Sequence, residues 1–359
     1  MTDVGKLTLS VIHDGASVRE VSIRSTRPTA AQLLIGKTPA QVLQVVPQLF
    51  SVCGRAQTAA AGAAMDAAMQ TSVPASATMV RSLMCEAMQE HLWRLMLDWP
   101  KALGLAQQEQ AFAKWYAMLR KISAGGIGFE VFQNEFGRDY LGMPIDDWRD
   151  IDGCQALQAW THHAHSPAAR LLARLSEMEQ GRPAGNIKSL PAWTAVDAAL
   201  ACSGRWGGAF AARPDWQGTA AETGVGSYYS DDPLLRDVVQ QGWPRAMTRV
   251  LARILDVVEM ASGNPQPRLD AASPSAGEGV AVVRTARGLL IHQVRIAEER
   301  VADYSIIAPT EWNFHPAGAF TQALLGLHER DGERLNQLAQ IEALSLDPCV
   351  PYEIEVCHA

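Results

Sequence analysis

The sequence predicts an α+β protein that is mostly helical, with small β-hairpins near both ends. From about residue 56 to residue 260 the chain is rich in alanine, leucine and methionine, and apolar residues such as Leu83, Ala87 and Leu92 recur at helical spacing. Near both ends, short apolar stretches are separated by turn residues, which is typical of hairpins. A chain of 359 residues can also bury a substantial core.

The first hairpin is predicted close to the N-terminus. Asp14-Gly15 supplies the turn, and the spacing of the flanking residues is compatible with a bulge. The apolar residues of its two strands alternate with polar ones: Leu7, Leu9 and Val11, then Val18, Val21 and Ile23.

A helix is predicted to begin at Pro39. Thr38 is a suitable N-cap, Pro39 takes the first helical position, and Gln41 completes a capping box. Apolar residues continue from Val42 toward Cys53. We expect Pro47 to kink or interrupt this helix, because proline removes a helical hydrogen bond and clashes with the preceding turn.

Residues 262–279 are predicted to form an internal loop or linker within a single domain that covers residues 1–359. This segment contains three prolines and several small residues. Beyond it we expect a second hairpin, whose strands at 280–283 and 289–296 flank Ala286-Arg287-Gly288, and helices over residues 318–328 and 332–344.

Composition excludes several classes of function. A net charge of −7 and the lack of a lysine- or arginine-rich block argue against nucleic acid as a partner. No secretory signal and no run of 18 apolar residues is visible, so we expect a cytoplasmic protein without a membrane contact. Six scattered cysteines in a reducing compartment do not suggest a disulfide framework.

Two cysteines are the main candidates for metal ligands. Cys349 follows Asp347-Pro348 close to the C-terminus, and Cys53 lies close to the N-terminal end. Thiolates bind soft and borderline metals, so two thiols from opposite ends of a chain can form one site. Cys357 is a further candidate, with a frayed terminus as the equal alternative.

Other cysteines and histidines have simpler interpretations. Cys85, Cys154 and Cys202 are predicted to be small core residues. The stretch from Thr161 to His165 has no accompanying carboxylate or cysteine pattern, so a solvated loop is favoured over a metal site. His292 is either a packed core residue or a group behind the site, and these two readings stay open.

Four segments resemble the large subunits of nickel–iron hydrogenases. They are Cys53-Gly54-Arg55-Ala56, Ala286-Arg287-Gly288, Pro309-Thr310-Glu311-Trp312-Asn313 and Cys349-Val350-Pro351-Tyr352. The resemblance implies a degenerate large-subunit-like core in which both chain ends meet at one site. In that family two Cys-x-x-Cys motifs hold nickel and an iron that carries two cyanides and one carbon monoxide. Here each motif keeps only its first cysteine.

The missing residues argue against an active hydrogenase. Ala56 and Tyr352 replace the second cysteines, which would leave nickel without its bridging sulfur ligands to iron. Ala31 falls where active subunits have a proton-gating glutamate, and alanine cannot relay a proton. Tyr352 could also restrict the access of nickel. We therefore expect no catalytic residue and no bound nickel.

The whole pattern is similar to the HupK/HoxV-type hydrogenase accessory proteins, a similarity that includes residues 90–100. The resemblance implies a non-catalytic scaffold or carrier in hydrogenase maturation. It would hold an Fe(CN)2(CO) fragment and pass it to the large-subunit precursor, with other maturation proteins as partners. Cys53 and Cys349 would be the thiolate ligands, and Arg287 and Thr310 would donate hydrogen bonds to the cyanides.

A second function is compatible with the same residues. The chain could act as an interaction chaperone that imitates the large subunit and binds maturation partners without holding iron. Retention of Arg287 and Thr310 favours the carrier, because a docking surface alone does not need buried cyanide donors.

Overall fold

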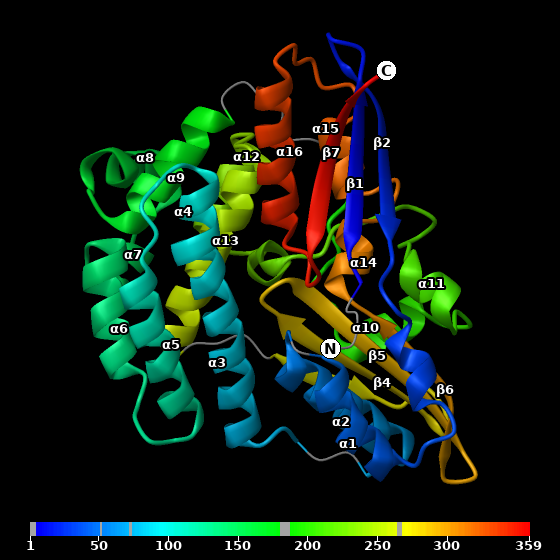
Figure 1. Cartoon of the computed structure of the whole chain (residues 1–359). Helices are drawn as coiled ribbons and strands as arrows, with labels where there is room; N and C mark the ends of the chain where they lie inside the picture. The colour runs from blue at the N-terminus through cyan, green and yellow to red at the C-terminus, as the bar shows by residue number, and fades with distance from the viewer. Residues whose placement is uncertain (1–4, 51, 72–73, 180–186, 264–267) are drawn as a thin grey trace. The chain divides into compact units, whose positions relative to one another are not determined.

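The computed structural model describes residues 5–50, 52–71, 74–179, 187–263 and 268–359 (Figure 1). The chain divides into two compact units. Unit 1 comprises Met1–Ala75, Ile187–Gly224 and Arg268–Ala359, and unit 2 comprises Ser76–Asn186 and Val225–Pro267. Unit 1 therefore contains all four segments that resemble the hydrogenase large subunit.

A three-stranded sheet joins the two ends of the chain. It has the order β2-β1-β7, with β1 at Leu7–His13, β2 at Val18–Ser25 and β7 at Tyr352–His358. β1 and β2 are antiparallel with a shift in register at Ile12 and His13, which confirms the predicted hairpin and its bulge. β7 runs parallel to β1, and Figure 1 shows the red and dark-blue strands side by side.

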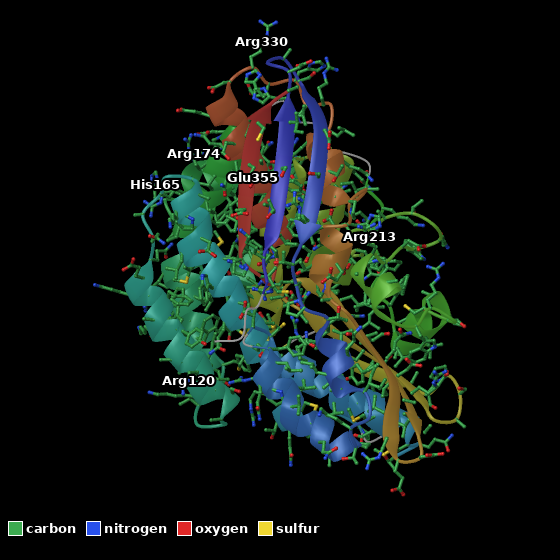
Figure 2. All side chains as sticks on the ribbon, turned by 45° about the vertical axis from the view of Figure 1, so that its right-hand side comes forward. Arg120, His165, Arg174, Arg213, Arg330 and Glu355 are labelled. Carbon is green, nitrogen blue, oxygen red and sulfur yellow. The ribbon has the colours of Figure 1, made fainter. Side chains whose placement is uncertain are left out.

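β7 was not predicted, although its sequence has the signal of a strand. Tyr352, Ile354 and Val356 are half-buried against the core of this sheet, while Glu353 and Glu355 alternate with them. Side-chain hydrogen bonds from β1 reach both glutamates, and Glu355 lies on β7 in Figure 2. The alternation is the period-2 pattern of a half-buried strand.

A four-stranded antiparallel sheet forms the second layer of unit 1. Its order is β3-β4-β5-β6, with β3 at Leu269–Ala272, β4 at Glu278–Thr285, β5 at Gly288–Ala297 and β6 at Arg300–Ile307. The second predicted hairpin is confirmed as β4 and β5. β6 was not predicted.

The segment 262–279 was predicted to be a loop or linker. This was wrong for Leu269–Ala272, which form the strand β3. The four residues of β3 pair with Val280–Val283 of β4, so their backbone hydrogen bonds come from a neighbouring strand that local sequence does not reveal. Residues 264–267 of the same segment lie outside the described residues. The boundary between the two units also falls in this segment.

Both faces of the four-stranded sheet are buried, which explains the nearly continuous apolar sequence of β4 and β5. Val280 and Val282 pack on one face with the helix α10 at Ala195–Ala201 and with Trp312. Ala281 points to the opposite face, where the helices α1 at Pro39–Leu49 and α2 at Gly54–Ala68 cover the sheet.

The start of α1 is as predicted, with Thr38 and Gln41 forming a reciprocal capping box. The expectation that Pro47 would interrupt the helix was wrong, since α1 continues to Leu49. Proline removes only its own bond to the carbonyl four residues earlier. Pro47 lies two residues before the end of α1, so few helical hydrogen bonds follow the one that it removes.

The remaining helices of unit 1 are short apart from α16. They include the helices predicted over 318–328 and 332–344, which the structure confirms as α15 and α16 with shorter or shifted bounds. In chain order they are η1 at Ala30–Leu34, α11 at Gly208–Ala212, α14 at Pro309–Asn313, α15 at Ala319–Leu324 and α16 at Gly332–Leu346.

Unit 2 holds most of the helical bundle predicted from about residue 56 to 260, whereas α2, α10 and α11 from that range belong to unit 1. The core of unit 2 contains an aromatic cluster around Trp115 and a buried hydrogen bond between His91 Nε2 and Asp256 Oδ2 at 2.8 Å. Its helical segments are α3 at Ala77–Trp93, η2 at Arg94–Asp98, α4 at Trp99–Ala102, α5 at Glu109–Ser123, α6 at Glu130–Phe136, η3 at Gly137–Leu141, α7 at Ile145–Arg149, α8 at Gly153–His163, α9 at Pro167–Met178, η4 at Val225–Tyr229, α12 at Pro233–Gln240 and α13 at Arg245–Ala261.

The prediction that Cys85, Cys154 and Cys202 are core residues is confirmed, whereas the loop predicted from Thr161 to His165 is confirmed only in part. Cys85, Cys154 and Cys202 are buried, and burial raises the pKa of the Cys154 and Cys202 thiols to about 12. None of the six cysteines, all of which lie among the described residues, forms a disulfide. The stretch from Thr161 to His165 was predicted as a loop, but its first three residues end α8, and the exposed His165 follows (Figure 2).

Within the described parts of the chain, we find no helix whose length and apolar character would allow it to cross a membrane.

Close packing of α2 on β4 depends on Gly279. A Cβ atom added there would lie 1.8 Å from the carbonyl oxygen of Ala64. We expect Gly279→Ala to lower the stability of the protein by roughly 1–3 kcal/mol or more, because backbone must move to relieve the overlap. Gly332→Ala is the matched control, since a Cβ at Gly332 has no described atom within 4 Å. Thermal unfolding followed by circular dichroism compares the two variants, and equal midpoints would contradict this packing.

Candidate functional site

A cavity of about 870 Å³ lies within unit 1, and both candidate thiols line it. Its walls come from the ends of β1 and β2, from η1, from the end of α1, from α11, β6 and α14, and from residues 349–351. Arg213, which follows α11 and is labelled in Figure 2, also lines it. Cys53 and Cys349 therefore meet at one place, as predicted from their positions near the two ends of the chain.

Cys349 is held by Thr310 through two hydrogen bonds. The Thr310 hydroxyl donates to Cys349 Sγ at 3.1 Å, and it accepts from the Cys349 backbone N–H at 3.1 Å. Thr310 lies in the first turn of α14. One turn later, Asn313 donates to the carbonyl oxygen of Leu346 at 3.2 Å. Because residues three apart share a helix face, the motif fixes the segment that precedes and contains Cys349.

Arg287 lies in the two-residue turn between β4 and β5 and reaches the same segment. Its Nε is 3.2 Å from Asp347 Oδ1, and both side chains are almost fully buried. Asp347 has a left-handed backbone with φ of 52° at the end of α16. The ion pair therefore stabilises the sharp exit from the helix two residues before Cys349.

Cys53 is the N-cap of α2 and has a left-handed backbone, with φ of 51°. A non-glycine residue rarely adopts this conformation unless the surrounding structure holds it. Gln57 provides one such contact, because its side-chain Nε2 points at Cys53 Sγ at 4.0 Å. The small alanines of α2, Ala56 among them, are buried behind this turn.

A chain of hydrogen bonds links Gln57 to the core and resolves the two readings of His292. His292 is fully buried, with Nε2 at 2.8 Å from Gln57 Oε1 and Nδ1 at 2.8 Å from the Tyr304 hydroxyl. An amide oxygen only accepts, so Nε2 carries the proton and Nδ1 accepts from Tyr304. His292 is thus both a core residue and a group behind Cys53, through Gln57.

The sequence did not point to Arg27, a partly buried cation that lines the cavity. Its Nη1 donates to Glu311 Oε1 at 2.8 Å, and both residues line the cavity. Burial alone would lower the pKa of Arg27, but the negative charges of Cys349, Glu311 and Cys53 outweigh it and raise that pKa. Burial also raises the pKa of Glu311, which Arg27 partly opposes.

Not all predicted site residues reach the cavity. The described residues that line it include none of Arg287, Thr310 and Cys357. Thr310 is buried beside Cys349, and Cys357 is exposed on β7, opposite Ile12 of β1. Ala31 lines the cavity within η1, whereas Tyr352 begins β7 and packs against the core of the three-stranded sheet.

The donor set limits the chemistry of this site. Among the residues that the structure describes, no group of three or more histidine, cysteine, aspartate or glutamate side chains is arranged to hold a metal ion. Its described lining residues offer the thiols of Cys53 and Cys349, the partly buried guanidinium of Arg27 and the partly buried carboxylate of Glu311. Such a set suits a ligand that needs few protein donors and carries negative charge.

Comparison with known proteins identifies the family. Over 94% of its length, the chain is 29% identical to the hydrogenase expression/formation protein HoxV of Cupriavidus necator, covering 93% of that protein. Over 92% of its length it is 30% identical to the hydrogenase expression/formation protein HupK of Rhodobacter capsulatus, covering 91% of it. The chain belongs to the HupK/HoxV family of hydrogenase expression/formation proteins. It is therefore a hydrogenase maturation protein.

The relation of this HupK/HoxV protein to hydrogenases themselves is confirmed by sequence and fold. The profile of the nickel-dependent hydrogenase family matches residues 238–353. The structure of the nickel–iron–selenium hydrogenase from D. vulgaris Hildenborough superimposes with a TM-score of 0.59 at 14% identity, over 94% of each chain. The predicted fold, mostly helical and like the hydrogenase large subunit, is confirmed.

The buried His292 should make stability depend on pH. Burial lowers its pKa from 6.5 to about 3, so the unfolded chain binds an extra proton between these values. The stabilising effect of a neutral His292 is complete above pH 6.5 and is lost as the pH falls toward 3.

We therefore expect the stability difference between the parent and a His292→Gln variant to shrink below pH 6.5, by up to about 1.4 kcal/mol per pH unit. Denaturant unfolding at a series of pH values measures it. A difference that stays constant across this range would show that His292 is not a buried neutral group.

Proposed function

We propose that this HupK/HoxV protein is a non-catalytic carrier of the Fe(CN)2(CO) fragment of a hydrogenase. It would receive the fragment during maturation and pass it to the large-subunit precursor. The observation that supports the proposal most strongly is that Cys53 and Cys349 line one cavity together with the partly buried Arg27.

The two thiols suit iron in this form better than a bare metal ion. A bare ion needs several protein ligands, whereas an iron that already has three diatomic ligands leaves few positions for the protein. Two thiolates then fill a large share of the coordination positions that are left for the protein. The hydroxyl of Thr310 would keep the Cys349 sulfur in place through its donated hydrogen bond.

The roles proposed for Arg287 and Thr310 depend on how their donors are used. The Thr310 hydroxyl donates to Cys349 Sγ, so it would have to rotate to face a cyanide. Arg287 is paired with Asp347, which makes positioning of the Cys349 segment its most direct contribution. Both residues then support the carrier by holding a ligand cysteine, and neither is among the described residues that line the cavity.

The non-catalytic part of the proposal rests on the residues that surround the thiols. Ala56 is buried where a second thiolate would be needed near Cys53, and Ala31 lines the cavity without a titratable group. The partners would be other hydrogenase maturation proteins and the large-subunit precursor. The alternative is a chaperone that imitates the large subunit and binds the same partners without iron.

Replacing either thiol tests the carrier directly. We expect Cys53→Ala and Cys349→Ala to lose most of the bound iron and its cyanide and carbonyl infrared bands, because thiolate is the metal-binding form. Cys357→Ala is the matched control and should keep both, since Cys357 lies exposed on β7. Unchanged iron and bands in both cavity variants would contradict the proposed ligands and favour the chaperone.

Nickel content gives an independent test. With Ala56 and Tyr352 where bridging thiolates would be required, we expect much less than one nickel per chain and no hydrogen uptake or evolution. Metal analysis and a hydrogen-turnover assay measure these two properties. Stoichiometric nickel together with turnover would overturn the non-catalytic assignment.

A further inference from the structure

Arg27 differs in its surroundings from Arg287 and Arg213. Its side chain is only 16% exposed, and the groups that raise its pKa include both Cys349 and Cys53. Arg287, by contrast, is paired with Asp347 and is not among the described lining residues. Arg213 also lines the cavity but is exposed.

The charges of the cargo call for such a cation. Ferrous iron with two cyanides and one carbon monoxide is neutral, so coordination by two thiolates gives a complex of net charge −2, with no change of oxidation state. Placing this charge in a partly buried cavity is unfavourable without a compensating positive group. Arg27 is a partly buried cation at that place, and Glu311 already takes up part of its charge.

The geometry of the Arg27 side chain also suits cyanide. A guanidinium has five N–H donors in a planar fork, and the bond to Glu311 Oε1 uses one of them. Glu311 follows Thr310 in α14, so the same short helix positions both the Cys349 sulfur and the Arg27 fork. Cyanide nitrogens accept hydrogen bonds, and a charged donor makes such a bond roughly twice as strong.

We propose that Arg27, oriented by Glu311, recognises the cyanide ligands of the thiolate-bound iron complex. This rests on the proposed carrier function and adds its specificity: the cavity selects an anionic metal–cyanide complex over a bare metal ion. The role that family resemblance gives to Arg287 is then shared with, or taken by, a residue that lines the cavity. Glu311 is a positioning residue in this arrangement.

The test compares variants of the full chain isolated anaerobically from maturation-competent cells. We expect Arg27→Gln to reduce retained iron complex by roughly tenfold, which corresponds to about 1.4 kcal/mol of binding free energy. It should also shift the cyanide stretches of the complex that remains. Arg27→Lys keeps the charge but not the fork, so it should restore part of the iron while the cyanide bands stay shifted.

Two further variants separate recognition from general effects. Arg24→Gln removes the same charge from an exposed position of β2 and should leave iron and bands as in the parent. Glu311→Gln keeps Arg27 but loosens its position, so it should shift the cyanide bands with a smaller loss of iron. Circular dichroism confirms folding, and Arg27→Lys serves if Arg27→Gln does not fold.

The outcomes distinguish this inference from the carrier proposal. If the parent retains the iron complex and the Arg27 variants retain it equally with unmoved cyanide bands, the role of Arg27 is wrong and the carrier stands. If the parent binds no cyanide-bearing iron in cells that mature hydrogenase, the carrier proposal fails and the role of Arg27 fails with it.

Discussion

The parallel pairing of β1 with β7 is the constraint on which the thiolate cavity depends. It joins residues that are 345 positions apart in the chain, as in the hydrogen bond from Ser10 to Glu355. Parallel strands start at the same edge, so Cys349, just before β7, lies next to the start of β1. Because long-range pairing must overcome the entropy of loop closure, the buried core beside these strands is required to maintain the site.

Two ion pairs serve different purposes around this cavity. Arg287 and Asp347 are 5% and 0% exposed, and their pairing holds a strained backbone at the end of α16. The side chains of Arg27 and Glu311 are 16% and 18% exposed, and both residues line the cavity. A buried pair contributes little net stability once desolvation is counted, so we attribute positional specificity to the first and ligand recognition to the second.

Local sequence predicted the features whose cause is local. The capping box of Thr38 and Gln41 and both hairpins followed from residue types and positions. Arg27 was missed because its segment carries no motif, and only tertiary structure brings it beside the two thiols. β3 was missed because four residues with weak alternation become a strand only against β4.

Infrared spectroscopy of the protein, purified without oxygen from cells that are assembling hydrogenase, tests the central claim most directly. Cyanide and carbonyl stretches report the diatomic ligands of iron without interference from other metal sites. The carrier account predicts both kinds of band in the purified protein, in a fixed ratio to its iron content. Protein that binds its maturation partners but shows neither band would contradict the account and establish the chaperone instead.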